Sequence, residues 1–182
     1  MGYRIAVIVG SLRKESYNKK LAHALVSLAP EEHSFGFVDI QLPLLNQDLE
    51  HSLPAEVAAF KKSIQDAQGL LFVTPEYNRS IPGVLKNAID WGSRPNGTSA
   101  WAGKPAAIAG ISPGSTGTAM AQQHLRNVLS ALDVPVMPSP ELFLQAKEGF
   151  FDADGGIASE SSKQFLQKYL ARYIDWIHKF AK

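Results

Sequence analysis

The 182-residue chain contains no cysteine. This absence excludes disulfide bonds, thiolate nucleophiles, iron–sulfur ligation and a cysteinyl bond to a cofactor. Any redox chemistry would therefore need a bound cofactor. Histidine is also scarce, and its five occurrences show no spacing typical of paired metal ligands. We therefore expect no metal centre.

The sequence also lacks an excess of charge of one sign and lacks long apolar runs. The 18 lysines and arginines nearly balance the 17 acidic residues, and like charges do not cluster. The sequence therefore offers no basic patch of the kind that binds nucleic acid. No apolar run approaches the roughly 20 residues needed to cross a membrane, and the N-terminus lacks the layout of a signal peptide. We expect a soluble, cytoplasmic protein without nucleic-acid or membrane partners.

Enough apolar material is present to form a packed core. Apolar residues make up 45% of the chain and charged residues 19%, a composition typical of globular domains. A length of 182 residues suits one compact domain and is short for two. We therefore expect residues 1–182 to form a single domain.

Strand-like apolar runs alternate with segments of helical period along the whole chain. The expected strands cover residues 3–9, 34–40, 70–73, 105–111 and 134–137. The expected helices lie between Ser16 and Pro30, between Pro54 and Gly69, and over 84–91, 119–132 and 161–180. Residues 138–158 have no clear period and are expected to be irregular.

This alternation predicts an α/β fold, a doubly wound parallel sheet with helices on both faces. In the flavodoxin-like strand order 2-1-3-4-5, strands one, three and four are neighbours, whereas the dinucleotide order 3-2-1-4-5-6 separates strands one and three. The long polar loops follow strands one, three and four. We therefore predict the flavodoxin-like order, with one ligand held where these three loops meet.

The first of these loops, residues 10–18, has the composition of an anion site. Ser11, Arg13, Ser16 and Asn18 lie at the start of a helix, where unpaired N–H groups attract negative charge. The loop lacks the Walker motif and the three-glycine dinucleotide pattern, so a phosphomonoester fits best. The alternative is an ordinary capped turn with a solvated Arg13.

The second loop, residues 74–83, is long for a strand-to-helix connection and is stiffened by Pro75 and Pro82. Its Tyr77 offers an aromatic face and a hydroxyl group. Successive backbone N–H groups from Glu76 to Ser80 could face a flat heterocycle, as the O4 and N5 atoms of a flavin require. The alternative is a rigid surface turn.

The third loop begins with a formal match to the nucleophile elbow Gly-x-Ser-x-Gly, from Gly110 to Gly114. The oxyanion hole of such an elbow uses the backbone N–H of the residue after the serine. That residue is Pro113 here, which has no N–H. We therefore expect Ser112 and the amides of Gly114 and Ser115 to face a ring edge that becomes negative on reduction.

A second hydrolase interpretation stays open as a remote alternative. Gly10-Ser11-Leu12 and Asp175-Trp176-Ile177-His178 partly match the sequence blocks of small flavodoxin-like esterases. Both matches are incomplete, since Gly10 stands in place of the expected aspartate. Asp175 and His178 also fall within the expected terminal helix.

Three segments together resemble the NADPH-dependent FMN reductase family, and within it the bacterial chromate and quinone reductases. They are residues 10–18, Pro75-Glu76-Tyr77-Asn78 and Leu85-Lys86-Asn87-Ala88-Ile89-Asp90-Trp91. The resemblance covers essentially the whole chain and implies non-covalent FMN, reduced by NADH or NADPH. Quinones, free flavin, azo compounds or chromate would then accept the electrons in a ping-pong reaction. The alternative is a flavodoxin-like FMN electron carrier that docks a protein partner, although such carriers are typically strongly acidic.

The resemblance also assigns residues to parts of the cofactor. It implies that the phosphate and ribityl end is held by Ser11, Arg13, Ser16, Tyr17 and Asn18. The isoalloxazine ring would be held by Pro75, Glu76, Tyr77 and Asn78, and its pyrimidine side by residues from Ser112 to Gly114. Tyr77 and Arg79 would border the acceptor, and no side chain is assigned as a catalytic acid or base.

Relatives of this kind commonly form dimers or tetramers, so the resemblance implies a homodimer or homotetramer. The helix from Asn87 to Trp91 is one candidate for the subunit contact, although Ile89 and Trp91 could equally pack inside one subunit. Met120 and Gln123 stand where many relatives carry arginine and tyrosine. This departure leaves the details of the assembly open.

Overall fold

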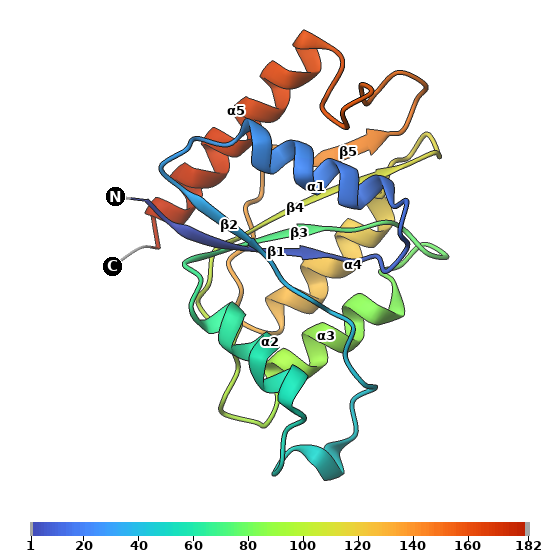
Figure 1. Cartoon of the computed structure of the whole chain (residues 1–182). Coiled ribbons are helices and arrows are strands. Elements are labelled where there is room, and N and C mark those ends of the chain that lie inside the picture. Colours follow the sequence, from blue (N-terminus) through green and yellow to red (C-terminus); the bar gives the residue numbers. More distant parts are fainter. Residues whose placement is uncertain (1, 181–182) are drawn as a thin grey trace.

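The structure is a computed structural model that describes residues 2–180. Five parallel strands form one sheet in the order β2-β1-β3-β4-β5, which confirms the predicted order (Figure 1). The strands are β1 Arg4–Val9, β2 Ser34–Phe37, β3 Gly69–Val73, β4 Ala106–Ser112 and β5 Leu142–Gln145. The central strands β1, β3 and β4 are buried almost throughout, as their continuous apolar runs predict.

Helices cover both faces of this sheet. They are α1 Tyr17–Leu28, α2 Ala55–Gln65, α3 Gly83–Ser93, α4 Ala119–Ser130 and α5 Glu160–His178, with a short 3-10 helix, η1, at Gln47–Leu49. Helices α1 and α5 pack on one face, and α2, α3 and α4 on the other (Figure 1). Within residues 2–180, no helix has both the length and the apolar character needed to cross a membrane.

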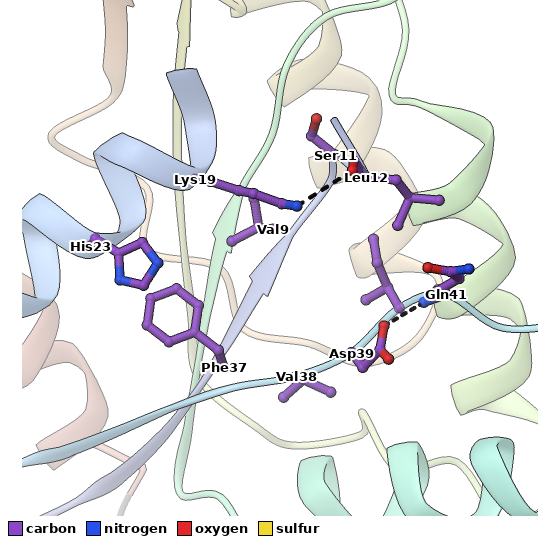
Figure 2. Close-up of a pocket in the computed structure, with 10 residues that line it drawn as sticks. Val9, Ser11, Leu12, Lys19, His23, Phe37, Val38, Asp39 and Gln41 are labelled. Atoms are coloured by element: carbon purple, nitrogen blue, oxygen red, sulfur yellow. Dashed lines mark hydrogen bonds between the residues drawn. The ribbon is translucent and has the colours of Figure 1, made fainter. Parts of the chain in front are cut away.

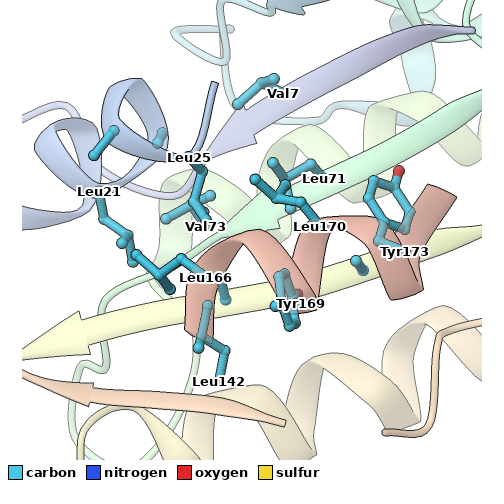
Figure 3. Close-up of a cluster of buried hydrophobic side chains, with 14 of the residues drawn as sticks. Val7, Leu21, Leu25, Leu71, Val73, Leu142, Leu166, Tyr169, Leu170 and Tyr173 are labelled. Carbon is cyan, nitrogen blue, oxygen red and sulfur yellow. The ribbon is translucent and has the colours of Figure 1, made fainter. Parts of the chain in front are cut away.

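The core is split by the sheet into two apolar layers. In the layer under α1 and α5, Leu25, Leu71 and Leu170 lie close together with two tyrosines (Figure 3). The Tyr169 hydroxyl donates a hydrogen bond to the Ile108 carbonyl at 2.8 Å. Desolvation by burial raises the pKa of both Tyr169 and Tyr173 above the ordinary phenol value, so the layer stays uncharged.

The fifth strand lies later in the chain than predicted. Residues 134–137 were expected to form it, but β5 is Leu142–Gln145, inside the segment expected to be irregular. The earlier segment pairs with β4 through one isolated bridge, between Val136 and Ala106. Pro138 and Pro140 have no N–H to donate, so the ladder breaks there and resumes farther along β4.

Strand β2 is also shorter than the expected 34–40, because it ends at Phe37. One further bond joins the Val38 N–H to the Val7 carbonyl at 3.0 Å. The Asp39 side chain then accepts a hydrogen bond from the Gln41 N–H at 2.9 Å. This side-chain turn leads the chain away from the sheet.

Candidate active site

Three loops meet at the carboxyl edge of the sheet: loop one (residues 10–16), loop two (74–82) and loop three (113–118) (Figure 1). They follow β1, β3 and β4, which are neighbours. Glycines allow this close approach. A Cβ on Gly10 would lie 2.9 Å from the Thr74 hydroxyl oxygen, and one on Gly110 would collide with Thr118.

Loop one presents unpaired hydrogen-bond donors. Among residues 2–180, the backbone N–H groups of 14–17 donate to no acceptor. The buried Ser16 caps α1, because its Oγ accepts from the Asn18 N–H at 3.2 Å. The exposed Arg13 forms no ion pair within the same residues. Donors at a helix start, together with a free guanidinium, fit a phosphate group.

Two further residues of this segment differ in their surroundings. Ser11 is buried, and its Oγ accepts from the Arg13 N–H at 3.3 Å. Tyr17 opens α1 with its side chain partly exposed. Both therefore lie at the mouth of the helix, where the sequence analysis placed them.

Asn18 is paired inside the protein. Its Nδ2 donates to the Ile111 carbonyl at 2.9 Å, and its Oδ1 accepts from the Ile111 N–H at 3.0 Å. The side chain therefore ties the start of α1 to the end of β4. Because its amide atoms are already engaged, Asn18 can contribute to phosphate binding only by fixing the position of loop one.

Loop two contains a tight turn between Tyr77 and Ser80, whose backbone groups exchange hydrogen bonds of 2.9 and 3.0 Å. Asn78 and Arg79 take φ angles of 50° and 66°, in the left-handed region used by such turns. The expected series of free N–H groups from Glu76 to Ser80 is therefore interrupted, because Tyr77 and Ser80 use theirs in the turn. Tyr77 is 53% exposed, so its ring is accessible beside the loop.

The Glu76 carboxylate connects loop two to α4. One oxygen accepts from the Met120 N–H at 3.0 Å and from the Ala121 N–H at 3.1 Å. The other lies 3.5 Å from the Arg79 guanidinium, and the Glu76 side chain is only 10% exposed. A carboxylate at a helix N-terminus is stabilised by the unpaired N–H groups and the helix dipole.

This capping role of Glu76 was not predicted from the sequence. The available signal was local: the first turn of α4 contains no acidic residue, and Thr118 makes no capping hydrogen bond with its side chain. Helix α4 therefore needed a capping group from another part of the chain.

Loop three is shaped by Ser112. Its hydroxyl donates to the Gly117 carbonyl inside the loop, while Gln145 donates to the Pro113 carbonyl at 3.1 Å. The N–H groups of Gly114 and Ser115 have no acceptor among residues 2–180. The loop therefore offers exposed backbone donors, and the Ser112 hydroxyl is engaged within the loop.

Two side chains of α3, Asn87 and Trp91, hold the segment that follows β2. Asn87 accepts from the Leu45 N–H at 2.8 Å and donates to the Pro43 carbonyl at 2.9 Å. Trp91 donates to the same carbonyl at 2.7 Å. Trp91 and Ile89 are fully buried, so they pack inside the subunit, one of the two alternatives that the sequence left open.

The geometry argues against the esterase interpretation. His178 lies at the end of α5, where its Nδ1 is 2.8 Å from the Tyr3 hydroxyl, just before β1. Ser11 lies beyond the other end of β1, a strand of six residues. At about 3.3 Å per residue, the strand alone separates the two groups by roughly 20 Å. They cannot form a nucleophile and base pair.

Comparison with known proteins shows the family of the chain. The family model for NADPH-dependent FMN reductase matches residues 3–149. A 2-hydroxy-1,4-benzoquinone reductase of Burkholderia sp is 55% identical over 178 residues, 97% of each chain. A quinone reductase of Pseudomonas putida is 48% identical and covers 96% of this chain and 95% of its own. The flavoenzyme NAD(P)H:(acceptor) oxidoreductase of Paracoccus denitrificans matches with a TM-score of 0.94 and 43% identity over 98% of both chains.

The donors of the three loops fit the cofactor of this family. The unpaired amides of loop one and the Arg13 guanidinium match a phosphate monoester, and the free Gly114 and Ser115 amides of loop three match the carbonyl edge of a flavin. Together with the similarity over nearly the whole chain, this fit identifies the cofactor as FMN and the donor as NAD(P)H. The chain belongs to the NADPH-dependent FMN reductase family and is an FMN-dependent NAD(P)H oxidoreductase.

Proposed function

We propose that this chain reduces quinones with electrons from NADH or NADPH by a ping-pong mechanism. The observation that carries the proposal is the group of unpaired backbone donors on loops one and three, at the same edge of the sheet. The relatives named quinone reductase, at 55% and 48% identity, support a quinone as acceptor. In the balanced reaction, NAD(P)H, a proton and a quinone yield NAD(P)⁺ and a hydroquinone.

FMN, when bound, supplies the hydride chemistry of this reaction. The chain's residues position it. Loop one and the start of α1 hold its phosphate and ribityl end. Loop two holds the ring, while the Gly114 amide stabilises negative charge on the pyrimidine side. The proposed cofactor residues are Ser11, Arg13, Ser16, Tyr17, Asn18, Pro75, Glu76, Tyr77, Asn78, Ser112 and Gly114.

The acceptor side of the site is assigned to loop two. Tyr77 is half exposed and offers an aromatic face to a flat quinone. The Arg79 side chain, two positions along the same loop, is 70% exposed and carries a positive charge. Chromate, azo compounds and free flavin are further acceptors that this open rim would admit.

The proposal extends to the assembly and its location. Residues 1–182 would act as one FMN-binding domain, because every strand joins the same sheet. We expect a homodimer or homotetramer, and the exposed apolar side chains of Leu12, Leu44 and Met120 are candidates for its subunit contact. The need for reduced pyridine nucleotide supports a place in the cytoplasm.

Anaerobic spectroscopy tests the function directly. We expect the purified protein to show a flavin spectrum that NADH or NADPH bleaches, and one equivalent of a benzoquinone to restore it. A protein that binds FMN but is not bleached by either nucleotide would instead be an electron carrier. A protein without FMN affinity would overturn the whole assignment.

A further inference from the structure

A cavity of about 520 Å³ lies at loop one on the β2 side of the molecule. Its walls come from the end of β1, from Ser11 and Leu12 of loop one, from Lys19 and His23 on α1, and from residues 37–41 at the end of β2 and after it (Figure 2). Loops two and three contribute no lining residue. The cavity therefore shares Ser11 with the proposed FMN phosphate loop and lies apart from the two loops proposed to hold the ring.

Two opposite charges line this cavity without neutralising each other. Lys19 Nζ donates only a long hydrogen bond, 3.4 Å, to the Leu12 carbonyl. Asp39 uses its Oδ1 to accept from the Gln41 N–H at 2.9 Å. Figure 2 shows them on different walls, and neither enters an ion pair within residues 2–180. A ligand with both anionic and hydroxyl groups would satisfy both.

The cavity also has a flat apolar wall. The Phe37 ring stacks on the His23 ring with centroids 4.4 Å apart and an interplanar angle of 27°. Phe37 is still 44% exposed, and the neighbouring Val38 adds further apolar surface (Figure 2). Such a wall suits a flat heterocycle such as a purine.

The position of Asp39 in the fold is one at which acidic residues bind ribose. It lies two residues beyond β2, the second strand of the β1-α1-β2 unit. In nucleotide-binding α/β units, an acidic residue near this place accepts hydrogen bonds from the ribose hydroxyls. Because Oδ1 is held by Gln41, the other carboxylate oxygen remains for such a contact.

We propose that this cavity binds the adenosine end of the NAD(P)H donor. The inference rests on the proposed function and adds the place where the donor is held. Asp39 accepts from the ribose diol, the adenine lies against Phe37, and Lys19 lies near the pyrophosphate. The 2′-phosphate of NADPH carries about two negative charges and would lie near the Asp39 carboxylate, which repels it. The site therefore favours NADH over NADPH.

Binding of ADP-ribose to the FMN-loaded protein, measured by calorimetry, tests this proposal without turnover. Asp39→Asn keeps the turn acceptor and removes the charge. We expect it to weaken ADP-ribose about tenfold, and to raise the NADPH-to-NADH ratio of kcat/KM by a similar factor. FMN affinity should not change. As a control, Asp48→Asn removes an equal charge from the same β2–α2 connection, at a position outside the cavity. It should leave the ADP-ribose affinity, the NADPH-to-NADH ratio and the FMN affinity unchanged.

Lys19 provides a second, independent variant. Lys19→Gln should also weaken ADP-ribose, while Lys20→Gln, one position along α1 and outside the cavity lining, should not. Unchanged ADP-ribose affinity in both cavity variants would overturn the proposal. A loss of FMN affinity instead would also overturn it, because the cavity would then belong to the cofactor. In either case, bleaching by NADH would still show that the proposed function holds.

Discussion

Arg13 is the side chain to which we assign the charge contact with the FMN phosphate. It is exposed and forms no ion pair within residues 2–180. Charge-assisted hydrogen bonds contribute about 1.5–3 kcal/mol, so Arg13→Ala should weaken FMN binding roughly 10- to 100-fold. Titration of the apoprotein, followed by quenching of flavin fluorescence, measures the change. Lys14→Ala removes an equal charge one residue away, and an equal loss in that control would contradict a specific role for Arg13.

Asn18 shows where residue type alone misleads. A polar side chain at the start of a helix has the chemistry of a ligand contact, and the sequence suggested that role. In the structure both of its amide atoms pair with Ile111 in β4. A buried polar group must find a partner, and this partner is 93 positions away in the chain.

At the scale of elements, Glu76 holds loop two against the start of α4. Glu76→Ala would leave the Met120 and Ala121 N–H groups without their acceptor. We expect the free energy of unfolding of the apoprotein to fall by about 1–2 kcal/mol, as for the loss of other N-terminal caps. Urea unfolding, followed by circular dichroism, measures this. Glu76→Gln retains an oxygen acceptor and should recover much of the loss. Stability equal to wild type in the alanine variant would refute the capping role.

The fifth strand illustrates the limit of reading elements from local pattern. Val134 to Met137 and Leu142 to Gln145 are both short apolar segments that could form a strand. Local propensity does not choose between them. Pairing with β4 does, because its later residues, from Ala109 to Ser112, align with the second segment.

For the molecule as a whole, FMN binding should raise the stability of the fold. A ligand that binds only the folded state at 100 times its Kd stabilises it by about 2.7 kcal/mol. For a chain of this size, that corresponds to an increase in Tm of roughly 5–10 °C. Thermal unfolding by circular dichroism, with and without FMN, measures the shift. Riboflavin, which lacks the phosphate, should give a smaller one, and equal shifts would contradict the assignment of loop one.

The sequence by itself determined the alternation of strands and helices and the parallel sheet, and it predicts a ligand at the carboxyl edge of that sheet. These follow from apolar periodicity and from polar loops after strands one, three and four, which are local features of the chain. Only the tertiary structure decided which polar groups remain free for a ligand. Asn18 with Ile111, Glu76 with Met120 and Asn87 with Leu45 pair across 93, 44 and 42 positions. Such pairs form because folding brings distant polar groups together, and a buried group such as the Asn18 amide needs a partner.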